Sequence, residues 1–495
     1  MTITPMKPAR LKLMDNHYGA PGNNGLGWKT VSLQRSELSI LEKYSGKRIA
    51  EWHKLGVPIL SDYDPAGNER DDDSRNLSFF TLDRDNNGNT PQTWINTHNC
   101  MGVVRLHDKA SGAAVQIEIG SRFDKGSKPF FLTYLLSKVF GGSIVDLVDL
   151  GKDSLWDLLL AFLFRRRLLA ASAIGLFKHY QTFGHNDTRI RGRIDVNEHL
   201  RRNIPFRGTV AYATHEITFD NPTNHLIRYA LEKVRRKWPG CLLGDHRLTE
   251  TEHQLEQGTP TWQQGGVMAC IRHKENRTPV KHPYFGARYE PLRQASLAIL
   301  RDEGAGLYQQ HQEAEGVIFD GSWLWEEYLW TLLEPLGFEH PENKNKKGAW
   351  KPLDTVSLYP DFFHRKKRAI LDAKYKGGDP SPEDAKQVFA YMFLLDAVHG
   401  GLIKPDGSPK ARSRINRECK DAEPSSWHNI VLSPPQAAIA KEFKDAMGAE
   451  EEKFCKALEG LEVDWPEQMD ATLRERLRTL DGPGANVCPA ELAGA

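Results

Sequence analysis

The sequence has no apolar stretch long enough to cross a membrane. Its longest apolar run, residues 158–164, ends at the three arginines of residues 165–167, whereas a membrane helix needs roughly 20 predominantly apolar residues. Residues 1–16 also lack the continuous hydrophobic segment of a secretory signal. We therefore expect a cytoplasmic protein with no membrane partner.

Paired cysteines and a nucleotide-binding loop are also missing. The six cysteines lie far apart in the sequence, which argues against a zinc module and a disulfide framework. The pattern G-x-x-x-x-G-K-[ST], which cradles the phosphates of a nucleotide, does not occur. We therefore expect any nucleotide-driven motor that works with this chain to be a separate protein.

The length and the charge distribution indicate several domains. A chain of 495 residues is too long for one ordinary core, so two or three domains are expected. The net charge of +1 hides an asymmetry. Residues 151–240 hold 16 Lys and Arg against 8 Asp and Glu, whereas residues 436–495 hold 7 against 13. The middle of the chain is therefore better suited to a polyanion than the C-terminal end.

The first two thirds of the chain divide into a β-rich and a helical part. Two strand-like runs around a DKASG turn predict a β-hairpin over residues 100–119, and we expect a β-rich N-terminal domain over residues 1–145. Apolar residues at helical spacing predict a mostly helical middle region over residues 146–314, including a helix at about residues 222–238. Residues 240–314 are expected to form a polar, irregular insertion within it.

The last third predicts a separate α/β domain. Residues 315–435 read as helix, hairpin, helix and further strands, an order that fits a mixed sheet flanked by helices. Residues 436–495 are acidic and are expected to form a helical C-terminal extension. The predicted fold class is a multidomain protein of the α+β or mixed α/β type.

One hairpin within this domain carries the strongest chemical signal. Asp361 follows Pro360 at its start, and Asp372 and Lys374 stand two residues apart in its second apolar run. Because side chains alternate across a strand, Asp372 and Lys374 must project from the same face. Two carboxylates and an ammonium group in an apolar setting are costly to bury unless a cation lies among them. This pattern indicates metal-dependent cleavage of phosphodiesters, although surface salt bridges could give the same spacing.

The two neighbouring helices add polar residues to this pattern. Glu326 shares an apolar helical face with Trp323 and Trp330, so it needs a partner unless it is exposed. After the hairpin, Gln387 and Tyr391 are four residues apart and therefore lie on one helical face. Glu326 alone, or Gln387 and Tyr391 alone, could belong to an ordinary helix surface, but together with the hairpin they favour a functional site.

The order Glu326, Pro-Asp361, Asp372-x-Lys374, Gln387-x-x-x-Tyr391 resembles the PD-(D/E)xK nuclease superfamily, including the Gln-Tyr motif of its RecB-like branch. The resemblance implies a restriction-endonuclease-like α/β domain over residues 315–435. It also implies that Asp361, Asp372 and the Ala373 carbonyl bind Mg²⁺, for which Mn²⁺ can substitute, with Glu326 assisting through water. Lys374 would hold or deprotonate the attacking water, and Gln387 and Tyr391 would position the DNA backbone.

The segments RIRGRIDVNEHLRRNIP at residues 189–205 and VAYATHEITFDNPTNHLIRYALEKV at residues 210–234 resemble the McrC family, the cleavage subunits of McrBC-type modification-dependent restriction systems. The likeness runs from about residue 95 to about residue 435. It implies an endonuclease directed to DNA that carries 5-methylcytosine. It also implies a McrB-like AAA+ GTPase ring as partner, with residues 1–145 docking on the ring.

Two other functions fit the same residues. The chain could be a PD-(D/E)xK nuclease that acts alone or with a helicase in DNA repair. It could also be a non-catalytic adaptor that keeps the fold and regulates a ring NTPase, but the intact set of Asp361, Asp372 and Lys374 argues against an adaptor.

Overall fold

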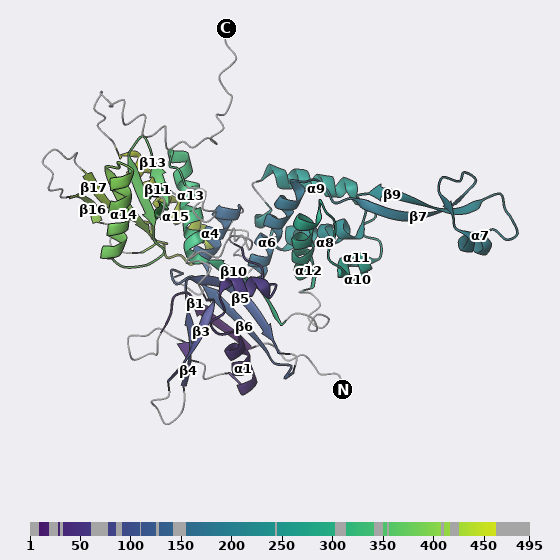
Figure 1. Cartoon of the computed structure of the whole chain (residues 1–495), viewed down its shortest axis with the longest axis horizontal. Helices are drawn as coiled ribbons and strands as arrows, with labels where there is room; N and C mark the ends of the chain where they lie inside the picture. The colour runs from purple at the N-terminus through teal and green to yellow at the C-terminus, as the bar shows by residue number, and fades with distance from the viewer. Residues whose placement is uncertain are drawn as a thin grey trace, which may run out of the picture.

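The structure of the chain is a computed structural model, shown in Figure 1. It describes residues 9–18, 28–29, 33–60, 78–85, 92–108, 110–124, 128–141, 155–242, 245–301, 313–340, 350–353, 356–406, 410–415 and 425–461. These residues form three lobes: a lobe around the N-terminal sheet, a helical lobe from which a long arm projects, and a C-terminal α/β lobe. The mixed α/β class predicted from the sequence is confirmed.

The N-terminal lobe is built on a four-stranded sheet with the order β1-β6-β5-β10. Its strands are β1 (Ala9–Met14), β6 (Ala114–Gly120), β5 (Cys100–His107) and β10 (Ala314–Asp320). Strands β5 and β6 form the predicted hairpin. A second sheet, with the order β2-β4-β3, and two helices complete the lobe: β2 (Trp28–Lys29), β3 (Phe80–Asp85), β4 (Gln92–Thr97), α1 (Arg35–Tyr44) and α2 (Ile49–Lys54).

Strand β10 corrects the predicted boundary between residues 314 and 315. It pairs antiparallel with β5, so that Val317 lies opposite Val103 and the strand belongs to the N-terminal sheet. The two strands approach closely at Gly102, where a Cβ atom would lie 2.1 Å from the Val317 carbonyl oxygen. A pairing between segments so far apart leaves no periodic signal within either segment. The sequence therefore could not show that the chain returns to its first sheet before it enters the C-terminal lobe.

The helical lobe is more regular than predicted. Its main helices are α6 (Leu155–Ser172), α8 (Pro222–Lys237) and α12 (Gly286–Arg301). The expectation of an irregular insertion over residues 240–314 is wrong, because this segment contains α9 (His246–Gly258), α10 (Gly266–Arg272) and α11 (Lys274–Arg277) in addition to α12. Helix α9 is polar but buries Leu248, Thr251 and Leu255 at spacings of three and four. Its narrow apolar stripe explains why composition alone suggested a loop.

A β-ribbon arm interrupts the region that was predicted to be mostly helical. Strand β7 (His179–Asp187) pairs antiparallel with β9 (Val210–Thr218) along its whole length. The tip adds β8 (Arg193–Ile194) and α7 (Val196–Arg202). The arm projects away from the helical lobe (Figure 1). Because much of both of its faces lies in solvent, its sequence lacks the clean apolar alternation of a half-buried strand.

The C-terminal lobe has the predicted mixed sheet between helices. The strand order is β13-β14-β15-β17-β16, with β14, β15 and β17 parallel and both edge strands antiparallel. The strands are β13 (Phe362–His364), β14 (Ala369–Ala373), β15 (His399–Lys404), β16 (Lys410–Ile415) and β17 (Ser425–Val431). The two-stranded sheet of β11 (Trp350–Leu353) and β12 (Val356–Leu358) lies just before them in the chain.

Four helices accompany this sheet or join it to the rest of the chain: α4 (Phe130–Phe140), α13 (Gly321–Leu333), α14 (Pro382–Leu394) and α15 (Ala440–Glu459). Helix α15 lies in the predicted acidic extension. Any further helix predicted after it falls in residues 462–495, outside the described residues. Within the described ranges, no helix is both long and apolar enough to span a bilayer.

Candidate active site

The predicted hairpin brings Asp361 and Asp372 to the same end of the sheet. Strands β13 and β14 pair with Phe362 opposite Leu371, which places Asp361 beside Asp372. The Ala373 N–H donates to Asp361 Oδ2 at 2.8 Å. Asp372 is only 1% exposed, whereas Asp361 is half-buried. The two carboxylates therefore converge at the end of a buried strand.

Lys374 and the Gln-Tyr pair extend this cluster. Lys374 Nζ lies 2.7 Å from Asp372 Oδ2, as expected for side chains on the same strand face. It also donates to Gln387 Oε1 at 3.1 Å, and Gln387 Nε2 donates to the Tyr391 hydroxyl at 2.8 Å. The Tyr391 hydroxyl in turn donates to the Tyr359 carbonyl at 3.3 Å. An ion pair and two hydrogen bonds thus link four side chains in series: Asp372, Lys374, Gln387 and Tyr391.

The electrostatics of the cluster are those of crowded acids. Burial raises the pKa of Asp361 well above its ordinary value, and the nearby charges of Asp372 and Glu326 raise it further. Burial also raises the pKa of Asp372, although the Lys374 ammonium group opposes this. Burial lowers the pKa of Lys374, but the carboxylates of Asp372, Asp361 and Asp384 together outweigh burial, so the pKa of the lysine is raised. Lys374 is therefore held in its charged form.

Glu326 approaches the cluster from α13. Its side chain is half-buried, and its charge contributes to the raised pKa of Asp361. All six side chains predicted from the sequence therefore belong to one neighbourhood, formed by α13, the β13–β14 hairpin and α14.

Two residues near the cluster were not predicted. His340 Nδ1 donates to the Asp361 carbonyl at 2.6 Å, and its ring centroid lies 4.9 Å from that of Phe362. Asp384 Oδ2 lies 2.5 Å from Lys376 Nζ, and the side chain of Asp384 completes the capping box at the start of α14. The charge of Asp384 also raises the pKa of Asp372. Neither residue has a spacing to the Asp-x-Lys motif that periodicity could detect.

The donor set fits a hard divalent cation. The structure shows no group of three His, Cys, Asp or Glu side chains arranged to hold a metal within the ranges it describes. However, the buried Asp372 Oδ2 has the Lys374 ammonium group as its close partner, at 2.7 Å. Two convergent carboxylates suit Mg²⁺, which takes few protein ligands and keeps several waters.

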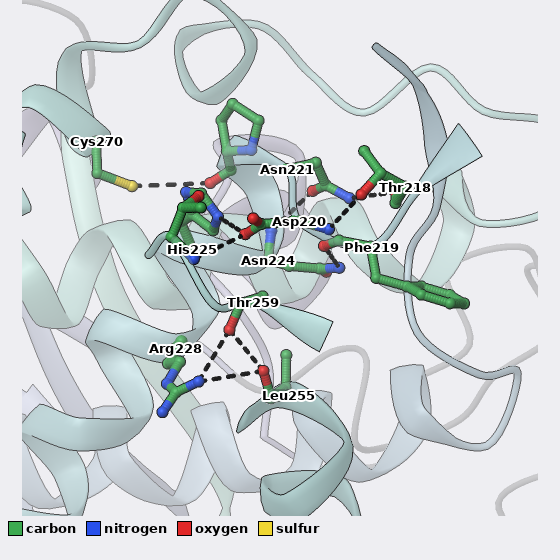
Figure 2. Close-up of polar contacts among 12 residues, drawn as sticks. Thr218, Phe219, Asp220, Asn221, Asn224, His225, Arg228, Leu255, Thr259 and Cys270 are labelled. Carbon is green, nitrogen blue, oxygen red and sulfur yellow. Dashed lines mark hydrogen bonds and ion pairs between the residues drawn. The ribbon is translucent and has the colours of Figure 1, made fainter. Parts of the chain in front are cut away.

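A second polar cluster fixes the arm to the helical lobe. Asn221 and Asn224 belong to the Asp-Asn-Pro-Thr-Asn segment of the sequence, and both are fully buried. Asn221 caps α8 by accepting from the Asn224 N–H at 3.0 Å, and Asn224 Nδ2 donates to the Phe219 carbonyl at 2.7 Å (Figure 2). Both amides also donate to the Phe177 carbonyl, at 3.0 and 2.8 Å. The start of α8 therefore holds both ends of the arm: Phe177, just before β7, and Phe219, just after β9.

We expect the substitution Asn224→Ala to lower the free energy of unfolding by on the order of 1–3 kcal/mol, because it leaves buried carbonyl groups short of a donor. Urea denaturation of the full chain measures this effect. The matched control is Gln254→Ala on the exposed surface of α9, which should change stability by less than about 0.5 kcal/mol. Equal stability of the two variants would contradict the role of Asn224 at the base of the arm.

These features define a mixed α/β protein with a cluster of two acids and a lysine at one end of a mixed sheet, where Asp372 is buried. Residues 95–405 match the family described as McrBC 5-methylcytosine restriction system component. This match covers more than half of the chain, so the chain belongs to that family, and the resemblance of the sequence to a component of McrBC-type systems is confirmed.

Two solved structures are similar to this one. The first is a refined half-complex from the tetradecameric assembly of Thermococcus gammatolerans McrB AAA+ hexamers with bound McrC; it is 14% identical, with a TM-score of 0.44, covering 89% of this chain and 100% of that chain. The second is the cryo-EM structure of the Thermococcus gammatolerans McrBC complex; it is 14% identical, with a TM-score of 0.31, covering 66% of this chain and 87% of that chain. No curated protein matches the sequence.

Proposed function

We propose that the chain is an McrC-like subunit, a Mg²⁺-dependent DNA endonuclease that works with a McrB-like AAA+ GTPase on DNA carrying 5-methylcytosine. The observation that carries the proposal is the convergence of Asp361, Asp372 and Lys374 at one end of a buried strand. Membership of the restriction-system family supports DNA as the substrate and supports other components as partners. On this proposal, residues 315–435 contain a PD-(D/E)xK nuclease domain.

Each residue of the site has a role in this reaction. Asp361, Asp372 and the Ala373 carbonyl would hold Mg²⁺, which supplies charge stabilisation at the phosphate and lowers the pKa of a bound water. The raised pKa of Lys374 favours its ammonium form, so it is better suited to orient the water and stabilise the phosphate charge than to accept a proton. Gln387 holds Lys374 through its carbonyl oxygen and is itself exposed, so it can contact the DNA backbone. Tyr391 is only 5% exposed, and it would help to position the DNA by holding Gln387 through its hydroxyl.

We expect cleavage to require Mg²⁺ or Mn²⁺, and to stop with Ca²⁺ or a chelator. Ca²⁺ binds the same oxygens with a larger and looser shell, which does not orient the attacking water. The measurement is the initial rate of plasmid cleavage in each metal. Plasmid cleavage at the full initial rate in excess chelator would show that the proposed metal dependence is wrong.

The pH dependence gives this experiment a second readout. Burial raises the pKa of both Asp361 and Asp372, and the charge of Asp372 raises the pKa of Asp361 further, so protons compete with the metal more than they would at exposed carboxylates. Rising pH removes these protons. The Mg²⁺ concentration for half-maximal cleavage should therefore fall as the pH rises from about 6 to about 8.

The surface of the arm supports a protein partner. Half of the exposed large apolar side chains in the described residues lie on the arm: Tyr180, Phe183, Ile190, Ile194, Val196, Leu200, Ile204, Phe206 and Ile217. Such a gathering of exposed apolar groups is typical of a protein interface. The described part of residues 1–145 exposes only Tyr18 and Leu55 of this kind. We therefore assign the main contact with the GTPase to the arm rather than to residues 1–145, where the sequence had placed it.

A further inference from the structure

The N-terminal sheet reaches the candidate site through the residue that follows Lys374. Tyr375 is 4% exposed, and its ring lies 5.0 Å from the Arg122 guanidinium carbon. Arg122 Nη2 donates to the Tyr375 carbonyl, and the Tyr375 hydroxyl hydrogen-bonds with Ser121 Oγ at 2.7 Å. Ser121 and Arg122 directly follow β6. A side chain of the N-terminal lobe therefore holds the backbone one residue beyond Lys374.

Arg122 is itself fixed in one orientation. Its N–H donates to Asp15 Oδ1 at 2.6 Å, and its Nη1 donates to Asp15 Oδ2 at 2.6 Å. Asp15 is fully buried, and its own N–H donates to the Gly120 carbonyl at 2.9 Å. Of the two Arg122 donors, the first is the backbone N–H, so the carboxylate holds the guanidinium group through Oδ2 alone. Because Nη1 binds Asp15 and Nη2 binds the Tyr375 carbonyl, the guanidinium group cannot rotate without losing charge-assisted hydrogen bonds.

The helix that carries Glu326 starts at the same place. The Gly321 N–H, at the beginning of α13, donates to the Asn99 carbonyl at 2.8 Å. A Cβ atom at Gly321 would lie 3.0 Å from Tyr375 Cε1 and 2.8 Å from Met101 Cε, so a side chain at this position would require both neighbours to shift. The start of α13, Tyr375 and the N-terminal sheet therefore meet at one tightly packed point. This point sets the spacing between the helix of Glu326 and the strand of Lys374.

If this junction served only to pack the two lobes together, a buried ion pair would be a costly way to do so. A buried ion pair loses hydration, and apolar side chains of similar volume often stabilise a fold equally well. Burial raises the pKa of Asp15 to about 6 despite the adjacent arginine, which shows that the carboxylate is ionised at a cost. The Asp15–Arg122 pair instead provides a directional contact. Its guanidinium group holds the Tyr375 carbonyl at a defined position, whereas an apolar contact would not.

We propose that Arg122 is a positioning residue for the nuclease centre: held by Asp15, it fixes the Tyr375 carbonyl and thereby the placement of Lys374 relative to Asp372. The inference rests on the proposed nuclease function. It assigns to the N-terminal sheet a part in cleavage that is separate from partner binding.

The test compares three variants of the full chain. Arg122→Lys keeps the charge but has one nitrogen in place of the two, Nη1 and Nη2, that bind Asp15 and the Tyr375 carbonyl, so it loses the rigid fork that joins them. Ser121→Ala removes the buried hydrogen bond to the Tyr375 hydroxyl but leaves the carbonyl contact in place. Arg105→Lys changes an arginine on the same sheet that binds Gln116 at 2.9 Å.

We expect Arg122→Lys to lower kcat for DNA cleavage about 10- to 100-fold, because an ångström-scale misplacement of a reacting group costs rates of this order. The KM for DNA should change by less than about threefold, since the groups that bind DNA remain. Ser121→Ala should lose stability but keep kcat, and Arg105→Lys should keep both. A wild-type kcat in Arg122→Lys would overturn the proposal, and so would losses of kcat that simply follow the losses of stability.

Amide hydrogen exchange separates this inference from the proposed function. In Arg122→Lys, but not in Arg105→Lys, the amides of residues 374–376 should exchange at least about tenfold faster, whether or not the chain cuts DNA. If the wild-type chain never cleaves DNA but this exchange effect is present, the nuclease proposal fails while the link between the N-terminal sheet and β14 stands. Unchanged exchange at these residues would overturn the link itself.

Discussion

The variant Asp372→Asn is expected to lose at least about a hundredfold in DNA cleavage while keeping its fold. Asparagine has the same shape but cannot supply a charged oxygen to a metal, and losses of this size are typical when a group that stabilises transition-state charge is removed. The fold should survive because burial raises the pKa of Asp372, so its charge is a cost to the native state. Cleavage rate and thermal stability are measured on the same preparation.

Asp396→Asn is the matched control. Asp396 follows α14 and is largely exposed, and its Oδ2 lies 2.9 Å from Nη2 of Arg368 in the turn between β13 and β14, at the opposite end of these strands from the site. Its positive φ of 53° is one that asparagine also adopts readily. This variant should cut DNA at the wild-type rate. If Asp372→Asn were equally active, the assignment of the site would be wrong.

The double variant Leu200→Ser/Phe206→Ser is expected to lose the interaction with the GTPase. Both side chains lie near the tip of the arm and are 52% and 68% exposed, so the folded chain should not depend on them. Anchoring residues of an interface are worth about 2 kcal/mol or more each, so affinity should fall at least about 30-fold. The readouts are the binding of the purified GTPase and the stimulation of its GTP turnover.

Phe393→Ser is the control for the arm variant, because Phe393 is 84% exposed but lies on α14. It should leave binding and GTP turnover unchanged. If the arm variant also binds and stimulates normally, the partner contact lies elsewhere, and the N-terminal residues 1–145 become the first alternative.

The candidate site could be predicted because it depends on short-range periodicity. The two-residue spacing of Asp372 and Lys374 and the four-residue spacing of Gln387 and Tyr391 fix their faces before any tertiary structure is known. In the structure, one ion pair and two hydrogen bonds link these four side chains in series. The hairpin that brings Asp361 beside Asp372 was predicted for the same reason.

The missed features depend on contacts between distant segments. Arg122 meets Tyr375 across more than two hundred residues, and β10 joins a sheet whose other strands lie far earlier in the chain. Neither contact changes the local pattern of apolar residues. The arm was missed for a different reason, since its strands are largely in solvent and show little apolar alternation.

The most direct test of the account is to mix the purified chain with a McrB-like GTPase from the same organism and measure cleavage of methylated and unmethylated plasmid. With GTP and Mg²⁺ present, we expect the mixture to cut the methylated plasmid and to hydrolyse GTP faster than the GTPase alone. The chain by itself should cut neither plasmid appreciably, because its phosphate contacts alone give weak, salt-sensitive binding. Full-rate cutting of both plasmids by the isolated chain, with no effect on GTP turnover, would contradict the account and indicate a nuclease that acts alone.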